Sequence, residues 1–414
     1  MRVSCFIASR LGKNKTGKNL SGTGNFIAVL SVAISIAVII ISMAVSAGFR
    51  KEIKEKSVGF CGDAIIAPPG LSMNSELNPQ NFAIEPVPYL SKIEELPFVE
   101  KVQGVSYRPG LIKTEDEIQG IVLKGVADNY DWDFFESSLI EGSIPAKDSS
   151  QVLVSKRIAQ MLNLSLGERI TLYFIADEIK VRRFRISGIY SAQLEDYDKL
   201  YVITDIAEVN SINGWGDGVV SNYEVLFKDH SEKQMDHRNA LIASTIYNNA
   251  KDGDKALVVT GLKENMFRLL DWLHLLDMNV LIILILMIAV AGFNMISCIL
   301  IILFENISTI GVFKTMGMKN STVKEIFLVK SCKIVLYGLV AGNVFALLLC
   351  WLQGKYQFVS LNPDNYFLTH VPVSLSFSGV LVADVISFAA IMLILLLPCH
   401  FISKVNPAKT VKFK

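Results

Sequence analysis

The stretch of this sequence that comes nearest to a nucleotide-binding signature is GKNKTGKN, at residues 12–19. It almost matches GxxxxGK[ST], a loop whose backbone N–H groups cradle phosphates and whose final hydroxyl binds Mg²⁺. Asn19 stands where that hydroxyl is needed, and no predicted strand precedes the loop. We therefore interpret its lysines as charges on the inner side of a membrane span and expect no nucleotide site.

The other residue types that perform catalysis or bind metals are scattered. The five histidines show no metal-ligand spacing, and no Ser or Cys lies in a nucleophile-elbow sequence. These histidines are His230, His237, His274, His370 and His400. Cys61 is alone in the large hydrophilic region, so no disulfide framework is predicted there, and a buried thiol is favoured over a reactive or lipidated one. We expect no catalytic residue, no metal site and no enzyme.

Three features lie inside apolar stretches. Gly338-x-x-x-Gly342 allows another helix to approach closely. Asn294 is predicted to hydrogen-bond to a neighbouring helix, and for both features packing is favoured over transport. Asp384 is an intramembrane acid, which by default suggests function. Because it lies near the outer end of its span, a water-exposed or helix-paired carboxylate is favoured over a proton relay.

The elements that carry these residues are membrane spans. Of the 414 residues, 51% are hydrophobic and 19% are charged, which is too apolar for a soluble protein of this size. The net charge of +1 gives no sign of a nucleic-acid partner. Four stretches without charged residues can each cross a hydrocarbon core of roughly 30 Å. They are residues 26–48, 278–304, 334–354 and 385–403.

Lysine and arginine counts predict the orientation of these spans. The amino terminus has five such residues, the 305–325 loop three and the tail four, whereas the loop after the third span has only Lys355. Both termini and the 305–325 loop are therefore expected in the cytoplasm. Residues 50–273 then form one large domain outside the cytoplasmic membrane.

This outer domain is predicted to be α+β, because short alternating strands are interspersed with helices. The expected strands are 62–67, 118–124, 169–175, 181–189 and 223–227, and the expected helices are 155–164, 231–249 and 262–276. The last helix is expected to run into the second span. Two sub-lobes are predicted, with the linker within residues 136–151.

The expected organisation is thus an α-helical membrane protein with four transmembrane helices and a large periplasmic α+β domain between the first two. The expected segments are 1–24 (cytoplasmic), 25–49 (span), 50–273 (periplasmic), 274–304 (span), 305–325 (cytoplasmic coupling helix), 326–353 (span), 354–377 (periplasmic loop), 378–403 (span) and 404–414 (cytoplasmic tail).

The polar-rich segment 305–327 lies between two spans and is predicted to be amphipathic. Its apolar positions are Ile307, Ile310, Phe313 and Met316, and Glu305 and Lys314 lie on other faces. Gly317 is predicted to end this helix in the left-handed conformation. Thr322 and Glu325 form a capping-box pattern that predicts the start of the next helix. The segment must therefore lie on the membrane surface or against a partner.

Several motifs resemble those of the FtsX-like, MacB-type permease superfamily, the type VII ABC exporters, and most of all the LolC/LolE-type lipoprotein-releasing permeases. FIASR at 6–10 is similar to the family's FIAxR start, GFRKEI at 48–53 to its GFxxEL/I, and GFCGD at 59–63 to its GFGxH-like run. ENISTIGVFKTMG at 305–317 is similar to the REIGVLKAMG coupling segment. Pro398 and NPA at 406–408 resemble the YPAxxAxxxxPAEALR ending.

The resemblance implies a permease subunit that binds no cofactor, with ATP and Mg²⁺ used by a separate cytoplasmic ATPase. It also implies a second permease copy or paralogue, an acylated lipoprotein substrate, surrounding membrane lipids, and a periplasmic lipoprotein carrier. The implied coupling residues are Glu305, Ile307, Ile310, Gly311, Phe313, Lys314, Met316 and Gly317. The residues implied where the substrate passes in are Val45, Ser46, Gly48 and Phe49.

Two departures from the family pattern affect the residues implied for substrate entry and the docking of a carrier. AVSAGF at 44–49 replaces the usual SVMNGF, and the connection at 176–179 is predicted to be too short for the carrier-binding hook of LolC-like members. Two alternatives remain open. One is a MacB-like exporter of small molecules or peptides, and the other is an FtsX-like signal transmitter that activates a cell-wall hydrolase.

Overall fold

A computed structural model describes residues 20–70, 82–114, 117–175, 179–230, 232–251, 254–305, 311–312, 314–362 and 368–402. The chain divides into two compact units. We call residues 1–51, 273–360 and 370–414 the helical unit, and residues 52–272 with 361–369 the sheet unit.

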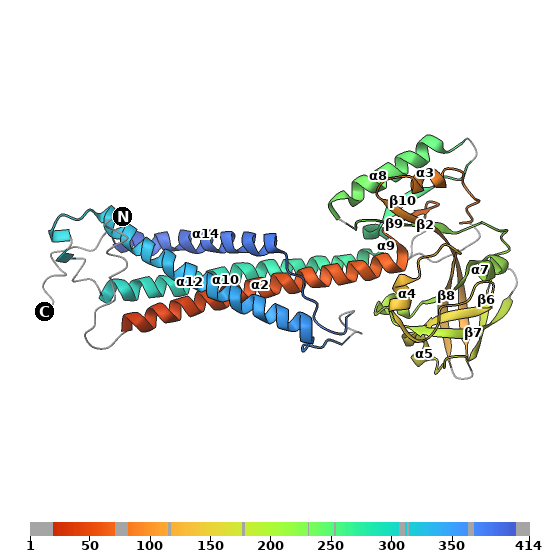
Figure 1. Cartoon of the computed structure of the whole chain (residues 1–414), viewed down its shortest axis with the longest axis horizontal. Coiled ribbons are helices and arrows are strands. Elements are labelled where there is room, and N and C mark those ends of the chain that lie inside the picture. The colour runs from red at the N-terminus through yellow and green to blue at the C-terminus, as the bar shows by residue number, and fades with distance from the viewer. Residues whose placement is uncertain are drawn as a thin grey trace. The chain divides into compact units, whose positions relative to one another are not determined.

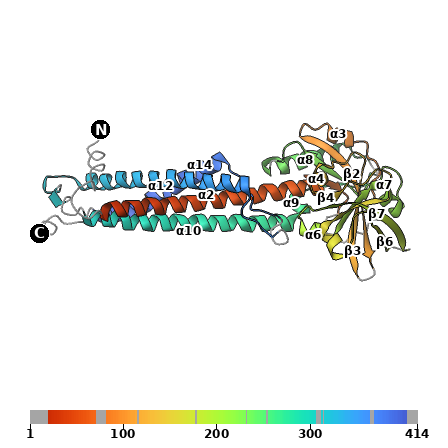
Figure 2. The same cartoon turned by 60° about the horizontal axis from the view of Figure 1, so that its bottom comes forward.

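Long apolar helices build the helical unit (Figure 1). They are α2 (Leu20–Cys61), α10 (Phe267–Glu305), α12 (Asn320–Tyr356) and α14 (Phe377–Ile402). Among the described residues, these four helices are the ones long and apolar enough to cross a membrane. The predicted spans are therefore confirmed as helices, and α2 continues past its span to Cys61. Figures 1 and 2 both show α2 and α10 side by side.

One apolar core joins these four helices, and it is uneven along their length. Its fully buried members in α2 lie between Ala28 and Ile40, and those in α10 lie between Ala291 and Leu303. α12 and α14 contribute Val335, Ala346, Ile391 and Leu395, among others. Among the side chains that the structure describes, the half of α10 before Ala291 contributes no buried residue to this core.

The described strands of the sheet unit form one ten-stranded sheet in the order β10-β1-β9-β2-β3-β8-β5-β7-β4, with β6 paired to β2 and β7. The strands are β1 (Ala64–Ala67), β2 (Val99–Lys113), β3 (Ile118–Val126), β4 (Leu139–Gly142), β5 (Gln151–Ser155), β6 (Arg169–Phe174), β7 (Lys180–Tyr190), β8 (Tyr201–Asp205), β9 (Asn222–Phe227) and β10 (Val258–Gly261).

Because β6 pairs with both β2 and β7, six strands close into a ring of β2, β3, β8, β5, β7 and β6. Closure removes the unpaired edges that these strands would otherwise expose. The interior is filled by fully or almost fully buried apolar side chains from every strand of the ring. Examples are Ile112, Leu123, Val202, Val154, Ile186 and Leu172.

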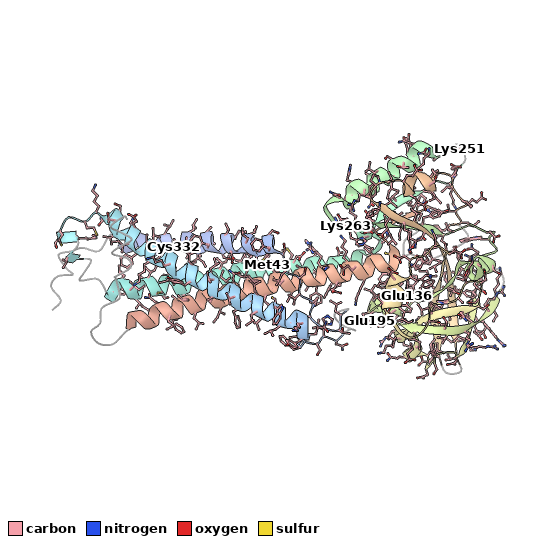
Figure 3. All side chains as sticks on the ribbon, viewed as in Figure 1. Met43, Glu136, Glu195, Lys251, Lys263 and Cys332 are labelled. Carbon is pink, nitrogen blue, oxygen red and sulfur yellow. The ribbon has the colours of Figure 1, made fainter. Side chains whose placement is uncertain are left out.

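The helices of the sheet unit are α3 (Leu90–Glu94), α4 (Asp133–Ser137), α5 (Lys156–Met161), α6 (Glu195–Asp198), α7 (Ile206–Asn213), α8 (Glu232–Asn249) and α9 (Leu262–Asn265). Ile158 of α5 and Val209 of α7 belong to the apolar core of the ring. Ser155 begins α5 by accepting a hydrogen bond from the Ile158 N–H. Charged side chains such as those of Glu136, Lys251 and Lys263 are exposed on this unit (Figure 3).

The predicted strands and the helices at 155–164 and 231–249 are confirmed to within a few residues. β2 pairs with β9 up to Val105 and with β3 from Val105 onward, so this one long strand takes part in both halves of the sheet. The division into two sub-lobes with a linker within 136–151 stays a prediction.

Two helix predictions are wrong. The helix expected over 262–276 is interrupted, because Met266 adopts φ −122° and ψ 37°, outside the helical region, and α10 begins only at Phe267. The capping box at Thr322 is also wrong. α12 begins at Asn320, and the Thr322 N–H already donates to the Lys319 carbonyl, so Thr322 lies inside the first turn.

Candidate functional site

The residues predicted to line the substrate's path lie near the outer end of the apolar part of α2. Val45 and Ser46 are half-buried, while Gly48 and Phe49 are buried. An ideal Cβ on Gly48 would lie 2.5 Å from the Pro372 carbonyl oxygen, so only glycine fits here. The connection before α14 therefore packs directly on α2.

Asp277 of α10 joins this group, although the sequence analysis did not single it out. The Ser46 hydroxyl donates to Asp277 Oδ1 at 2.9 Å. Arg50, one helical turn further along α2, forms an ion pair with Asp277 Oδ2. One carboxylate on α10 therefore holds two donors from the same face of α2.

The glycines Gly338 and Gly342 bring α12 against α2. An ideal Cβ on Gly338 would lie 2.7 Å from the Val32 side chain, and one on Gly342 would lie 2.6 Å from the Ala33 carbonyl oxygen. Small residues at this spacing allow two helix backbones to approach closely. The structure thus places both residues in a helix contact.

The two polar residues noted inside the spans are paired with neighbouring helices. Asn294 of α10 donates to the Ser31 hydroxyl of α2. Asn343 of α12 donates to Asp384 Oδ2 of α14 at 2.9 Å. Asp384 Oδ1 and the buried Ser387 hydroxyl have no hydrogen-bond partner among the described residues. Asp384 is therefore a helix-paired carboxylate with one unsatisfied acceptor.

The predicted coupling segment is described only in part. Ile307, Ile310 and Phe313 lie outside the described residues, as does the side chain of Glu305. Gly311 and Lys314 are helical, and Met316 is 79% exposed. Gly317 has φ +87°, as predicted for a residue that ends a helix in the left-handed conformation. The amphipathic face itself stays a prediction.

In the sheet unit, the end of α2 is held by a fully buried ion pair. Lys124 Nζ donates to the Phe60 carbonyl at 2.6 Å and to Glu224 Oε1 at 2.8 Å, and both charged side chains are 0% exposed. Gln103 and Tyr107 also donate to Glu224. A cation at the last carbonyls of a helix is favoured by the helix dipole. This cluster therefore fixes the end of α2 to β2, β3 and β9.

Two further lysines on α2 contact other segments of the sheet unit. Lys56 donates to Gln193 Oε1 at 2.6 Å, and Lys54 donates to the His230 carbonyl. The His230 ring lies 2.9 Å from the buried Asp63, whose pKa is raised by burial. Cys61 is a buried free thiol, as predicted, and burial raises its pKa.

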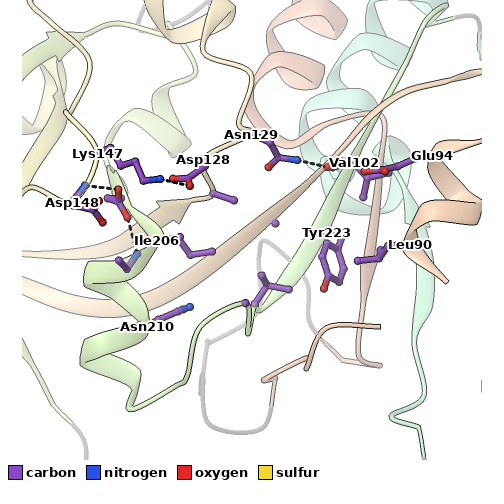
Figure 4. A pocket seen from close by; sticks show the side chains of 16 residues that line it. Leu90, Glu94, Val102, Asp128, Asn129, Lys147, Asp148, Ile206, Asn210 and Tyr223 are labelled. Carbon is purple, nitrogen blue, oxygen red and sulfur yellow. Dashed lines mark hydrogen bonds and ion pairs between the residues drawn. The ribbon is translucent and has the colours of Figure 1, made fainter. Parts of the chain in front are cut away.

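A pocket of about 580 Å³ lies in the sheet unit among β2, β9, α3 and α7 (Figure 4). Much of its polar lining is paired internally. Lys147 binds Asp128, Asn129 donates to the Val102 carbonyl, and the Asp148 N–H donates to Asp205. Among the described residues, no group of three or more His, Cys, Asp or Glu could hold a metal ion.

The chain matches two family descriptions. Residues 25–272 match the MacB-like periplasmic core domain, and residues 281–407 match the FtsX-like permease C-terminal domain. Together these matches include the four long helices and the sheet unit.

Curated relatives match over nearly the whole chain. The lipoprotein-releasing system transmembrane protein LolC of Xylella fastidiosa is 21% identical, covering 93% of each chain. LolC of Neisseria meningitidis serogroup B is 23% identical, covering 96% of each chain. LolE of Haemophilus influenzae is 22% identical, covering 99% of each chain.

Solved structures match about half of the chain. The periplasmic region of MacB from Actinobacillus actinomycetemcomitans is 14% identical with a TM-score of 0.32, covering 49% of this chain and 89% of that one. The four apolar helices and the periplasmic core domain place the protein in the inner membrane. The chain belongs to the FtsX-like ABC transporter permeases that carry a MacB-like periplasmic core domain between their first two membrane helices.

Proposed function

We propose that this permease extracts acylated lipoproteins from the inner membrane and delivers them to a periplasmic carrier. The proposal rests on the outer half of α10, which is apolar but not buried in the chain's own core. Exposed side chains there include Leu281, Ile282, Ile285 and Leu286. α2 runs beside α10 (Figures 1 and 2), so acyl chains that reach this surface of α10 would also come close to α2. The names of the full-length relatives support lipoproteins as the substrate.

A separate ATPase supplies the energy in this proposal, and this chain is not catalytic. Each acyl CH₂ contributes about 0.8 kcal/mol of burial energy in the bilayer. Removing several acyl chains therefore requires a source on the order of ATP hydrolysis. ATP and Mg²⁺ are bound by that ATPase, and a second permease copy or paralogue completes the complex.

In this proposal the carrier does not bind to a long hook at the connection between β6 and β7. Phe174 pairs with Lys180, so only five residues join the two strands. Connections of about five residues are common between the strands of a hairpin, and a long hook needs more residues than that. Docking of the carrier is therefore assigned to another surface of the outer domain.

The test is reconstitution of the complex with its ATPase in liposomes that contain a fluorescent acylated lipoprotein. We expect ATP-dependent release of the lipoprotein in the presence of a carrier. A complex with a hydrolysis-deficient ATPase is the first control, and the same protein anchored by a membrane span in place of acyl chains is the second. Equal release of both anchored forms, or no release while ATP is hydrolysed, would contradict lipoprotein extraction.

A further inference from the structure

The contact between α2 and α10 changes character along the two helices. In one half, buried side chains such as Val32 and Ile36 of α2 share a core with Met295 and Ile299 of α10. In the other half, between His274 and Val290, α10 has no buried residue. The fully buried apolar packing that the two helices share therefore lies in the cytoplasmic half.

The outer half is bridged by polar groups. Asp277 accepts a hydrogen bond from Ser46 at 2.9 Å and pairs with Arg50, and it directly precedes the apolar run that begins at Met278. The bridge therefore lies where the predicted hydrocarbon core meets the polar outer surface. A lipoprotein whose acyl chains lie between α2 and α10 has its protein part outside the hydrocarbon, so the link between the two parts crosses the level of this bridge.

We propose that Asp277 is a latch that holds the outer ends of α2 and α10 together through Ser46 and Arg50, and that the latch opens to admit the acyl chains of the substrate. This inference rests on the proposed function, because it assigns the latch to the path of the lipoprotein. Asp277 acts as a positioning residue, and its carboxylate sets the separation of the two helices.

The bridge from Asp277 to Ser46 and Arg50 is weak, as a contact that opens and closes must be. The side chains of Arg50 and Asp277 are 43% and 34% exposed, so neither charge is buried inside the chain when they separate. Ion pairs that remain in contact with water contribute little to stability. The two donors on one carboxylate still define one geometry, because Ser46 and Arg50 lie one turn apart on α2.

Reversible cross-linking tests the latch. In a background without other cysteines, Ser46→Cys/Asp277→Cys protein is treated with a short thiol cross-linker that a reductant cleaves. We expect cross-linking to reduce ATP-dependent lipoprotein release at least tenfold and reductant to restore it. A matched pair in the packed half, Ser31→Cys/Asn294→Cys, joins the same helices and is expected to change release less than twofold when cross-linked.

Exchanging the two charges provides a second test. A general loss of structure in the single variants would not be reversed in the double variant. Arg50→Asp and Asp277→Arg each place two like charges together, whereas the double variant restores an opposite pair. We expect each single change to alter the release rate at least fivefold and the double variant to recover to within twofold of the unmodified chain. Absence of recovery, with normal membrane insertion, would count against a latch.

The yield of cross-linking tests whether the latch opens, independently of which substrate is transported. We expect the yield of the Ser46→Cys/Asp277→Cys pair to fall at least twofold during ATP turnover, while the Ser31→Cys/Asn294→Cys yield stays constant. That result supports the latch even if no lipoprotein is released, in which case the proposed function is wrong. A yield independent of ATP, together with normal release by the cross-linked complex, overturns the latch.

Discussion

Lys124 and Glu224 show how single residues fix the end of a long helix. Lys124 Nζ contacts the last turns of α2 through the Phe60 carbonyl, and Glu224 receives Gln103 and Tyr107 as further donors. Burial together with Glu224 raises the pKa of Tyr107 well above its usual range, so its hydroxyl stays a donor. Each charge in the cluster is thus neutralised and hydrogen-bonded, as a buried ion pair requires.

Removing one charge of the Lys124–Glu224 pair should lower the free energy of unfolding more than removing both. Lys124→Met leaves Glu224 buried without its cation, and we expect a loss of roughly 3–5 kcal/mol in the free energy of unfolding. Lys124→Met/Glu224→Leu should lose less, because no unpaired charge remains buried. Chemical unfolding of the purified full-length chain measures both. A double variant no more stable than the single one would contradict this account.

Asp198 should make stability depend on pH. Burial raises its pKa to about 7, while backbone N–H donors and Lys56 act in the opposite direction. A carboxyl group whose pKa is higher in the folded chain holds its proton longer there. Its contribution to stability is therefore present below about pH 4 and lost as the pH rises to about 7.

We accordingly expect Asp198→Asn to flatten the pH dependence of unfolding between about pH 4 and 7. The change in slope is at most about 1.4 kcal/mol per pH unit. Burial also lowers the pKa of Lys56 to about 8, so the change in stability that comes from its titration lies above about pH 8, where stability rises with pH, and does not overlap this window. Asp196→Asn, at an exposed position of the same helix, is the control and should leave the slope unchanged.

At the scale of the helices, α12 contacts α2 closely because Gly338 and Gly342 have no side chains. Gly342→Leu would place a side chain against the Ala33 carbonyl and Ile36. Overpacking of this kind costs roughly 1–3 kcal/mol. We expect a lower thermal midpoint for the variant in detergent. Gly354→Leu is the control, because an added Cβ at that position of α12 meets nothing within 4 Å.

The end of the coupling segment depends on backbone conformation. Gly317 has φ +87° and open space around an added Cβ, so a substitution here is costly only through the backbone. A left-handed residue with a side chain costs about 1–2 kcal/mol, which corresponds to roughly tenfold in binding if the segment contacts the ATPase.

Copurification of the ATPase measures this effect. We expect Gly317→Val to weaken ATPase association roughly tenfold. Gly317→Asn should weaken it much less, because asparagine tolerates the left-handed region. Equal retention of the ATPase by both variants would show that segment 305–325 is not the coupling element.

At the scale of the whole molecule, the topology can be tested by labelling. An impermeant thiol reagent on intact spheroplasts should modify Lys251→Cys, an exposed position of the sheet unit, but not Lys319→Cys, which precedes α12. A background without other cysteines is required. Labelling of Lys319→Cys alone would reverse the orientation predicted from the lysine and arginine distribution.

The helices and strands whose signals lie within one short segment were predicted best from the sequence. Long apolar runs predicted the four helices, and short strand-like segments predicted β7 and β9, because those signals lie within one segment. β2 was missed, since Gly104, Pro109 and Gly110 interrupt its pattern, and its pairing with β3, β6 and β9 compensates for them.

Contacts between distant segments could not be predicted in the same way. Glu224 lies in a correctly predicted strand, but nothing near it in the sequence indicates that Lys124 neutralises it. Asp277 likewise appeared to be an ordinary charge at the end of a span, and only the arrangement of α2 beside α10 shows that Ser46 and Arg50 share it.

Where no other subunit covers it, the unburied outer half of α10 contacts phospholipid tails in a bilayer. A substrate acyl chain that reaches this surface replaces a phospholipid tail of the same chemistry, so the exchange is nearly isoenergetic. Phospholipids, which vastly outnumber any one lipoprotein, then compete for the surface by mass action. Under the proposed function, selection of a lipoprotein over a phospholipid therefore comes from its polar, protein part, outside the hydrocarbon.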